Sequence, residues 1–469
     1  MSEEKKNELK ELREKLFFTP KTAFDEGFDF TGCDSFCEGY KEYLDCGKTE
    51  RMCVEKSVRL AEMAGFVPYS RGMSLKPGDK IYKVNRKKAV ILAVIGEEPL
   101  CSGVNIAAAH IDSPRIDLKQ SPLYESDGLA LFKTHYYGGI KKYQWPAIPL
   151  ELHGVVALKN GEVRTVSVGS DASDPVFVIT DLLPHLGKDQ MSKKAGEVIT
   201  GEGLNVLCGS RPIDGADEKD TDAVKLNIMR ILNEKYGITE EDFLSAELCV
   251  VPAFRARDIG FDRSLIGAYG HDDRVCAYPS LRAIIDTALP KRTAVCMLAD
   301  KEEIGSEGVS GMKSRFFDTF IEDICSSFDT SVRECFENSS CLSTDVTVAM
   351  DPNFPEVCEK KNTAYLNRGV ALCKYTGARG KSGSSDASAE LIASLRALFD
   401  KNKVLWQMGS LGKVDQGGGG TVAMYMAERN IDTIDAGVPV LSMHSPFETV
   451  AKSDVFMTYK AICAFYKKF

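Results

Sequence analysis

The sequence predicts an α/β fold that is interrupted by a β-rich insertion. Apolar runs of strand length occupy 104–109 and 292–299, and polar residues follow each run directly. Continuous runs of this kind are typical of strands that are covered on both faces of a sheet. Between about 118 and 255 the pattern changes to short alternating segments, which favours exposed antiparallel strands. The chain is therefore expected to contain two structural parts.

The first part of the chain has the pattern of helices followed by strands. Leucines recur at helical spacing near the start, Gly65 ends a second helical pattern, and Pro77 with Gly78 marks a turn. We expect helices at 4–17 and 49–64, and then strands at 80–84, 89–95 and 104–109.

The middle of the chain is expected to form a domain of its own. Its alternating runs at 150–158 and 163–168 are separated by a turn signal. We therefore expect a catalytic domain made from residues 1–117 and 256–469, with the β-rich insertion at 118–255 between them.

The α/β pattern resumes at about residue 256. We expect strands at 345–350 and 437–441, and helices at 274–288, 385–399, 421–429 and 453–467. Asp345 opens the first of these runs, and His444 follows the second. Open parallel sheets gather their ligands at the carboxyl ends of their strands.

Composition indicates a large enzyme of the cytoplasm. The chain has 469 residues, of which 43% are hydrophobic and 27% charged, enough for an ample core and two domains. A net charge of -9 without a long basic run argues against a nucleic-acid partner. No stretch reaches the ~20 apolar residues of a membrane-spanning helix, and the start lacks the apolar core of a signal peptide. Fifteen scattered cysteines without a Cys-x-x-Cys pair indicate reduced thiols.

Five short segments carry the residue types of a metal site. They are Ala109-His110-Ile111-Asp112-Ser113-Pro114, His271-Asp272-Asp273-Arg274, Asp300-Lys301-Glu302-Glu303-Ile304-Gly305, Ser343-Thr344-Asp345-Val346-Thr347 and Met443-His444-Ser445-Pro446. Any one of them alone is usually a cap or a turn. Together they supply imidazole and carboxylate ligands, including a carboxylate that can bridge two ions ~3.5 to 4 Å apart. We therefore expect two Zn²⁺ per subunit, in a site that Co²⁺ or Mn²⁺ would also fit.

Seven residues of these segments can be given a role. The terminal metal ligands are expected to be His110, Glu303, Asp345 and His444, with Asp272 as the bridge. Asp112 lies two residues after His110 and is placed to accept the other ring N–H, which fixes the tautomer of that histidine. Glu302 remains as the free carboxylate beside the ligands, and we expect it to be the general base.

In their order and spacing, the five segments resemble the aspartyl-aminopeptidase family of dinuclear zinc metallopeptidases. The resemblance covers nearly the whole chain and points to a bacterial-type member. It implies an α/β, phosphorylase/hydrolase-like zinc peptidase domain with an inserted dimerisation domain. It also implies the same roles for His110, Asp272, Glu302 and Glu303, and a cis peptide bond between Asp272 and Asp273.

The resemblance extends to the assembly and to two further residues. In that family the insertion drives dimerisation, and the dimers form a tetrahedral dodecamer with enclosed active sites. His185 matches a histidine of the partner's insertion that helps to stabilise the oxyanion, and an ordinary exposed or core histidine is the alternative. Lys374 matches the specificity region and can pair with an acidic side chain. Arg379 and Lys381 compete for that role, and a plain surface cation is the alternative for each.

We expect a cytoplasmic, metal-dependent aminopeptidase that removes the N-terminal residue from peptides. The preference for acidic residues stays open, because the His271-Asp-Asp-Arg and His444-Ser-Pro-Phe-Glu motifs are closer to the related glutamyl- and deblocking-aminopeptidase family. Two alternatives remain: a related co-catalytic metal hydrolase, such as an amino-acid deacylase or carboxypeptidase, and a non-catalytic scaffold assembly. Glu302 argues against the scaffold, which would need no base beside its ligands.

Overall fold

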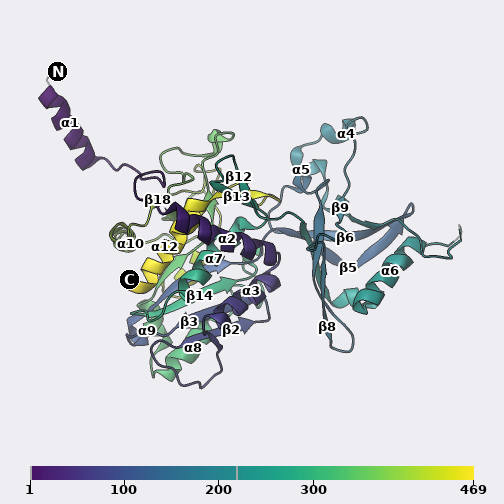
Figure 1. The fold of residues 1–469 in the computed structure, drawn as a ribbon, viewed down its shortest axis with the longest axis horizontal. Coiled ribbons are helices and arrows are strands. Elements are labelled where there is room, and N and C mark those ends of the chain that lie inside the picture. The colour runs from purple at the N-terminus through teal and green to yellow at the C-terminus, as the bar shows by residue number, and fades with distance from the viewer. Residues whose placement is uncertain (1–2, 218–219) are drawn as a thin grey trace.

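The computed structural model describes residues 3–217 and 220–469, which form two bodies joined side by side (Figure 1). Within these residues there are three sheets. The nine-stranded sheet lies in the body that contains the C-terminus, and the seven-stranded sheet forms the other body. Helix α1 (Glu3–Leu16) projects away from the first body.

The nine-stranded sheet is mixed, with parallel strands at its centre. In spatial order its strands are β1 (Val67–Pro68), β2 (Lys80–Asn85), β3 (Ala89–Val94), β14 (Thr293–Ala299), β4 (Val104–His110), β15 (Ser340–Ser343), β19 (Asp432–Gly437), β17 (Val370–Cys373) and β18 (Trp406–Met408). The four strands β14, β4, β15 and β19 run parallel to their neighbours in this group. Their carboxyl ends therefore meet at one edge of the sheet.

Both faces of this sheet are covered by helices. Val90 and Leu92 face a core shared with α2 (Phe30–Cys46), α3 (Glu50–Met63), α7 (His271–Ile285), α10 (Ala389–Lys401) and α12 (Lys452–Lys468). Ile91 and Ala93 face a second core with α8 (Phe316–Ser327), α9 (Val332–Glu337) and α11 (Val422–Ala427). Burial on both faces explains why β3 is apolar at every position.

The seven-stranded sheet is antiparallel throughout. Its strands in order are β8 (Val163–Val168), β7 (Leu150–Ala157), β11 (Ala246–Pro252), β5 (Arg115–Ser126), β6 (Leu129–Tyr137), β10 (Val206–Gly209) and β9 (Val178–Ile179). Helix α6 (Ala223–Tyr236) packs its apolar side against this sheet, and α4 (Lys188–Met191) and α5 (Ala195–Val198) are short. The predicted β-rich insertion is thus present, and its division at 118 and 255 remains our proposal.

The third sheet has five strands. It contains β12 (Arg257–Ile259), β13 (Leu265–Ala268), β21 (Glu448–Ala451), β20 (Pro439–Leu441) and β16 (Thr347–Val348). The strand predicted at 345–350 is shortened to β16, and the run predicted at 437–441 is divided between β19 and β20. Where the chain passes from one sheet to the other, the backbones of Gly437 and Asp345 approach so closely that a side chain at 437 would meet the Asp345 carbonyl.

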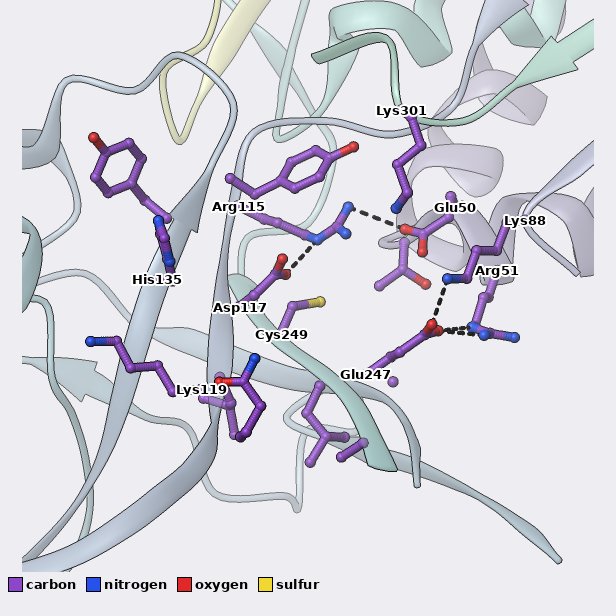
Figure 2. Close-up of a pocket in the computed structure, with 18 residues that line it drawn as sticks. Glu50, Arg51, Lys88, Arg115, Asp117, Lys119, His135, Glu247, Cys249 and Lys301 are labelled. Atoms are coloured by element: carbon purple, nitrogen blue, oxygen red, sulfur yellow. Dashed lines mark hydrogen bonds and ion pairs between the residues drawn. The ribbon is translucent and has the colours of Figure 1, made fainter. Parts of the chain in front are cut away.

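Ion pairs join the two bodies along their junction (Figure 2). Glu247 of the seven-stranded sheet accepts from Lys88 at 2.6 Å and from Arg51, which both belong to the first body. Arg115, at the start of β5, lies 3.2 Å from Glu50 of α3. These contacts fix the seven-stranded sheet against the edge of the first body.

Candidate metal centre

The five metal-site segments meet at the carboxyl edge of the parallel strands. His110 ends β4 and is paired with Ala299, the last residue of β14. The Glu302–Ile304 turn follows β14, and Asp345 follows β15. Asp272 stands at the start of α7, and His444 lies after β20. Residues far apart in sequence therefore come together where open α/β sheets place their ligands.

Asp272 lies between two histidines. Its Oδ1 is 3.1 Å from Nε2 of His110, and its Oδ2 is 3.1 Å from Nε2 of His444. The His110 nitrogen also lies 3.8 Å from Oδ1 of Asp345, and the His444 nitrogen lies 3.8 Å from Oε1 of Glu303. One carboxylate is thus shared by two groups of potential ligands.

Asp273 is a further carboxylate of this cluster, which sequence reasoning left without a role. Potential ligand atoms of His110, Asp273 and Asp345 lie within 4.8 Å of one another, as do those of His110, Asp272 and Glu303. Oδ2 of Asp273 accepts the backbone N–H of His110 at 3.3 Å. Its Oδ1 is buried and has no hydrogen-bond partner among the described residues. The peptide bond between Asp272 and Asp273 is cis, as predicted.

The buried carboxylates repel one another in the absence of a cation. Burial raises the pKa of Glu303 and Asp345 well above the usual value, and the charge of Asp272 adds to this shift. Burial opposes protonation of His444, but the neighbouring carboxylates of Asp272 and Glu303 raise its pKa to about 10. A cation among these groups would relieve the excess negative charge.

The donor set fits zinc. Two imidazoles and several carboxylates are ligands that Zn²⁺ accepts. Oε1 of Glu303 is buried and has no hydrogen-bond partner in the described part of the chain, as expected for an atom that coordinates a metal.

Glu302 lies beside the potential ligands. Its Oε2 is 3.8 Å from Nε2 of His110. Burial raises the pKa of Glu302 to about 7, and the charges of Asp112 and Asp272 contribute to the rise. A carboxyl group with such a pKa is suited to exchange protons near neutral pH.

Asp112 supports the site in a way that differs partly from the prediction. Nδ1 of His110 is 2.9 Å from the main-chain carbonyl of Asp112 and 3.4 Å from its carboxylate, so the carbonyl is the nearer acceptor. The carboxylate instead accepts the backbone N–H groups of Glu302 and Glu303, each at 3.2 Å. Either acceptor places the proton on Nδ1 and leaves Nε2 free for a metal.

Glu448 is a second residue that sequence reasoning did not assign. It is buried, and its two oxygens accept the backbone N–H groups of His444 at 2.7 Å and Asp272 at 3.1 Å. It therefore ties Asp272 to His444. Its place at the end of the His444-Ser-Pro-Phe-Glu motif was the available signal.

His185 and Lys374 lie outside this cluster. Neither side chain forms a hydrogen bond or ion pair with the five segments in residues 3–217 and 220–469. His185 is exposed, in the segment between β9 and α4. Lys374 donates to the Ala387 carbonyl at 2.7 Å and lies 3.2 Å from Asp386. Since β17 runs antiparallel to β19, Lys374 follows the strand end that points away from the cluster.

The comparison with known proteins decides the family. The sequence profile described as "Aminopeptidase I zinc metalloprotease (M18)" matches residues 43–466. The chain belongs to the M18 family of zinc aminopeptidases. The resemblance, the α/β fold and the zinc aminopeptidase activity expected from the sequence are thereby confirmed.

Bacterial M18 proteins are similar over nearly the whole chain. A probable M18 family aminopeptidase 1 of Clostridium acetobutylicum is 50% identical over 455 residues, which are 95% of this chain and 97% of the relative. The crystal structure of an M18 aminopeptidase from Thermotoga maritima has a TM-score of 0.92 at 45% identity, covering 97% of this chain and all of that one. The structure of aminopeptidase I from C. acetobutylicum has a TM-score of 0.90 at 48% identity, with the same coverage. No described helix of this M18 protein combines the length and the apolar character needed to cross a membrane.

Removing zinc from this M18 enzyme is expected to lower its thermal stability. Zinc binds only the folded site and offsets repulsion among the buried carboxylates, so chelation with EDTA should reduce Tm by about 5 °C or more. Scanning calorimetry of the stripped and reloaded protein measures the shift. Added Mg²⁺ is the control, because it prefers six oxygen ligands and should not restore Tm. An unchanged Tm after verified removal of zinc would contradict this prediction.

Proposed function

We propose that the enzyme acts through two zinc ions that share Asp272. The observation that carries the proposal is the equal 3.1 Å separation of the two Asp272 oxygens from two different histidine nitrogens. His110 and Asp345 would complete one ion site, and Glu303 and His444 the other. When bound, zinc supplies Lewis-acid polarisation of a carbonyl and lowers the pKa of water.

The residues around the ions would divide the remaining work. Glu302 would take a proton from the attacking water and deliver it to the leaving amine, a role that its position 3.8 Å from Nε2 of His110 supports. Asp112 holds Glu302 in place through its backbone N–H. The surrounding carboxylates favour the positive charge of a free α-amino group, which supports removal of N-terminal residues rather than internal cleavage.

The assembly and the finer specificity are part of this proposal. A yeast mApe1 with the same fold forms a dodecamer, at 21% identity and a TM-score of 0.75. In this chain Leu182, Leu183 and Leu186 are exposed around His185, and association with a second copy would cover them. We propose a homo-oligomer, up to a tetrahedral dodecamer, in which His185 reaches a partner's site. Lys374 would select acidic side chains only if it left Asp386 and moved toward the metal centre, because its strand end points away from that cluster.

We also propose that the enzyme works in the cytoplasm on peptides. The fifteen cysteines of the sequence are all unpaired in the structure, which suits a reducing compartment.

A panel of aminoacyl substrates tests the proposed function. Metal-stripped protein is given Zn²⁺, Co²⁺ or Mn²⁺ and assayed on free-amine and N-acetylated aminoacyl p-nitroanilides with acidic and neutral side chains. We expect metal-dependent cleavage of free-amine substrates only, with kcat/KM reporting the side-chain preference. Cleavage of the acetylated substrates would favour a deacylase, and no cleavage with any metal would favour a scaffold.

A further inference from the structure

The residues at the end of β6 reach the metal centre from the other body of the molecule. They are Tyr137, Gly138 and Gly139, here called the Tyr-Gly-Gly segment. The Tyr137 hydroxyl donates to Oδ2 of Asp112 at 2.7 Å. The Gly139 carbonyl lies 2.8 Å from Nδ1 of His444. The segment thus contacts His444 directly, and it contacts Asp112, which is the hydrogen-bond partner of His110.

Gly138 packs directly against a proposed ligand. Its φ is +76°, and an added Cβ would lie 3.1 Å from Oε2 of Glu303 and 3.4 Å from the Glu303 Cβ. Glycine is therefore needed here for two reasons, the backbone conformation and the contact with Glu303.

Two cations contact the Tyr137 ring. The Arg115 guanidinium lies 4.0 Å from the ring centre, and the Lys301 ammonium lies 5.5 Å from it. Arg115 is itself fixed by Glu50 and Asp117, as Figure 2 shows. These residues line a cavity of about 410 Å³ at the junction of the two bodies. The ring is thus braced on the side facing the cavity, and its hydroxyl is directed at Asp112.

Asp112 connects Tyr137 to the Glu302–Ile304 turn. It is fully buried, and the Tyr137 hydroxyl shares its carboxylate with the backbone N–H groups of Glu302 and Glu303. Loss of the hydroxyl would leave the carboxylate with one donor fewer and the turn less firmly held. A shift of this turn would displace the proposed base, Glu302, and the proposed ligand, Glu303, together.

We propose that the Tyr-Gly-Gly segment is a positioning element of the metal centre. Tyr137 orients the Glu302-Glu303 turn through Asp112, Gly138 sets the place of Glu303, and the Gly139 carbonyl fixes the ring of His444. This inference rests on the proposed function, because it takes those residues as base and ligands. The seven-stranded sheet then serves catalysis within a single chain, apart from any role in association.

Tyr137→Phe tests the hydroxyl. The zinc affinity of the stripped protein is measured by competition with a chromogenic chelator, and kcat and KM are measured on a free-amine substrate. We expect zinc affinity or kcat to fall about 10- to 100-fold, as for other groups that orient metal ligands, with KM nearly unchanged. Tyr136→Phe is the control, because this neighbour is 40% exposed and its hydroxyl makes no hydrogen bond among the described residues.

Gly138→Ala tests the contact with Glu303. Gly128, in the turn between β5 and β6, provides a matched control, because it has the same φ of +76°, but an added Cβ would meet nothing within 4 Å. Both alanine variants carry similar backbone strain, and only Gly138→Ala should weaken zinc binding.

The outcomes separate this inference from the proposed function. A wild-type protein that neither binds zinc nor cleaves free-amine substrates would overturn the proposed function. A wild-type protein that does both, with Tyr137→Phe matching Tyr136→Phe in zinc affinity and kcat, would overturn the positioning role of the segment. If Gly138→Ala does not fold, Tyr137→Phe decides the question by itself.

Discussion

Replacing Glu302 by glutamine is expected to lower kcat by about 10²- to 10⁴-fold while zinc remains bound, because a general base contributes roughly that factor. Glutamine keeps the size of the side chain and the backbone N–H that Asp112 accepts. It cannot take a proton from water or return one to the leaving amine. Steady-state kinetics and zinc analysis of the same preparation measure the two effects.

The control for this variant is Glu307→Gln. Glu307 lies in the same loop, is exposed, and pairs with Lys313 instead of the metal centre. We expect wild-type kinetics for the control. Near-normal turnover of Glu302→Gln would remove Glu302 from the mechanism and leave the base to be found elsewhere.

Replacing Asp272 by asparagine is expected to release both of the proposed zinc ions and reduce activity to the level of the stripped enzyme. The change removes the negative charge that the two groups of ligands share. It also leaves one side-chain oxygen where a bridging residue must offer one oxygen to each ion. Zinc content after dialysis, measured beside kcat, checks this prediction.

Two further variants show whether Asp272 is the bridge. Asp345→Asn should weaken the binding of only one of the proposed ions, since Asp345 lies beside His110 in the cluster. Asp286→Asn, at the far end of the same helix α7, should retain both ions. Two tightly bound ions in Asp272→Asn would show that another residue, such as Asp273, can serve as the bridge.

The sequence was most informative where burial or chemistry constrains every position. The strands β4 and β14 were predicted because residues on both of their faces are buried. Helix α2 was not predicted, because its buried side is formed by Cys33, Cys37, Tyr40 and Tyr43 rather than by the leucine pattern that usually reveals a helix.

The candidate site shows the same division. The five metal-site segments could be found because they combine histidine with carboxylates at strand ends. The parts played by Asp273 and Tyr137 depend on contacts between distant segments, which residue type does not reveal. The nearer acceptor for His110 is a main-chain carbonyl, a group that every residue possesses. Such contacts become visible only in three dimensions.

The order of the five segments along the chain has a consequence for biosynthesis. Pairing β4 with β14 brings residue 104 to residue 293, and the last proposed ligand is residue 444. Contacts between such distant residues close large loops and form slowly. A nascent chain that has not yet reached His444 therefore lacks a complete metal centre. The enzyme can therefore cleave peptides only after its C-terminal segment has been made and folded, and the nascent chain on the ribosome is inactive.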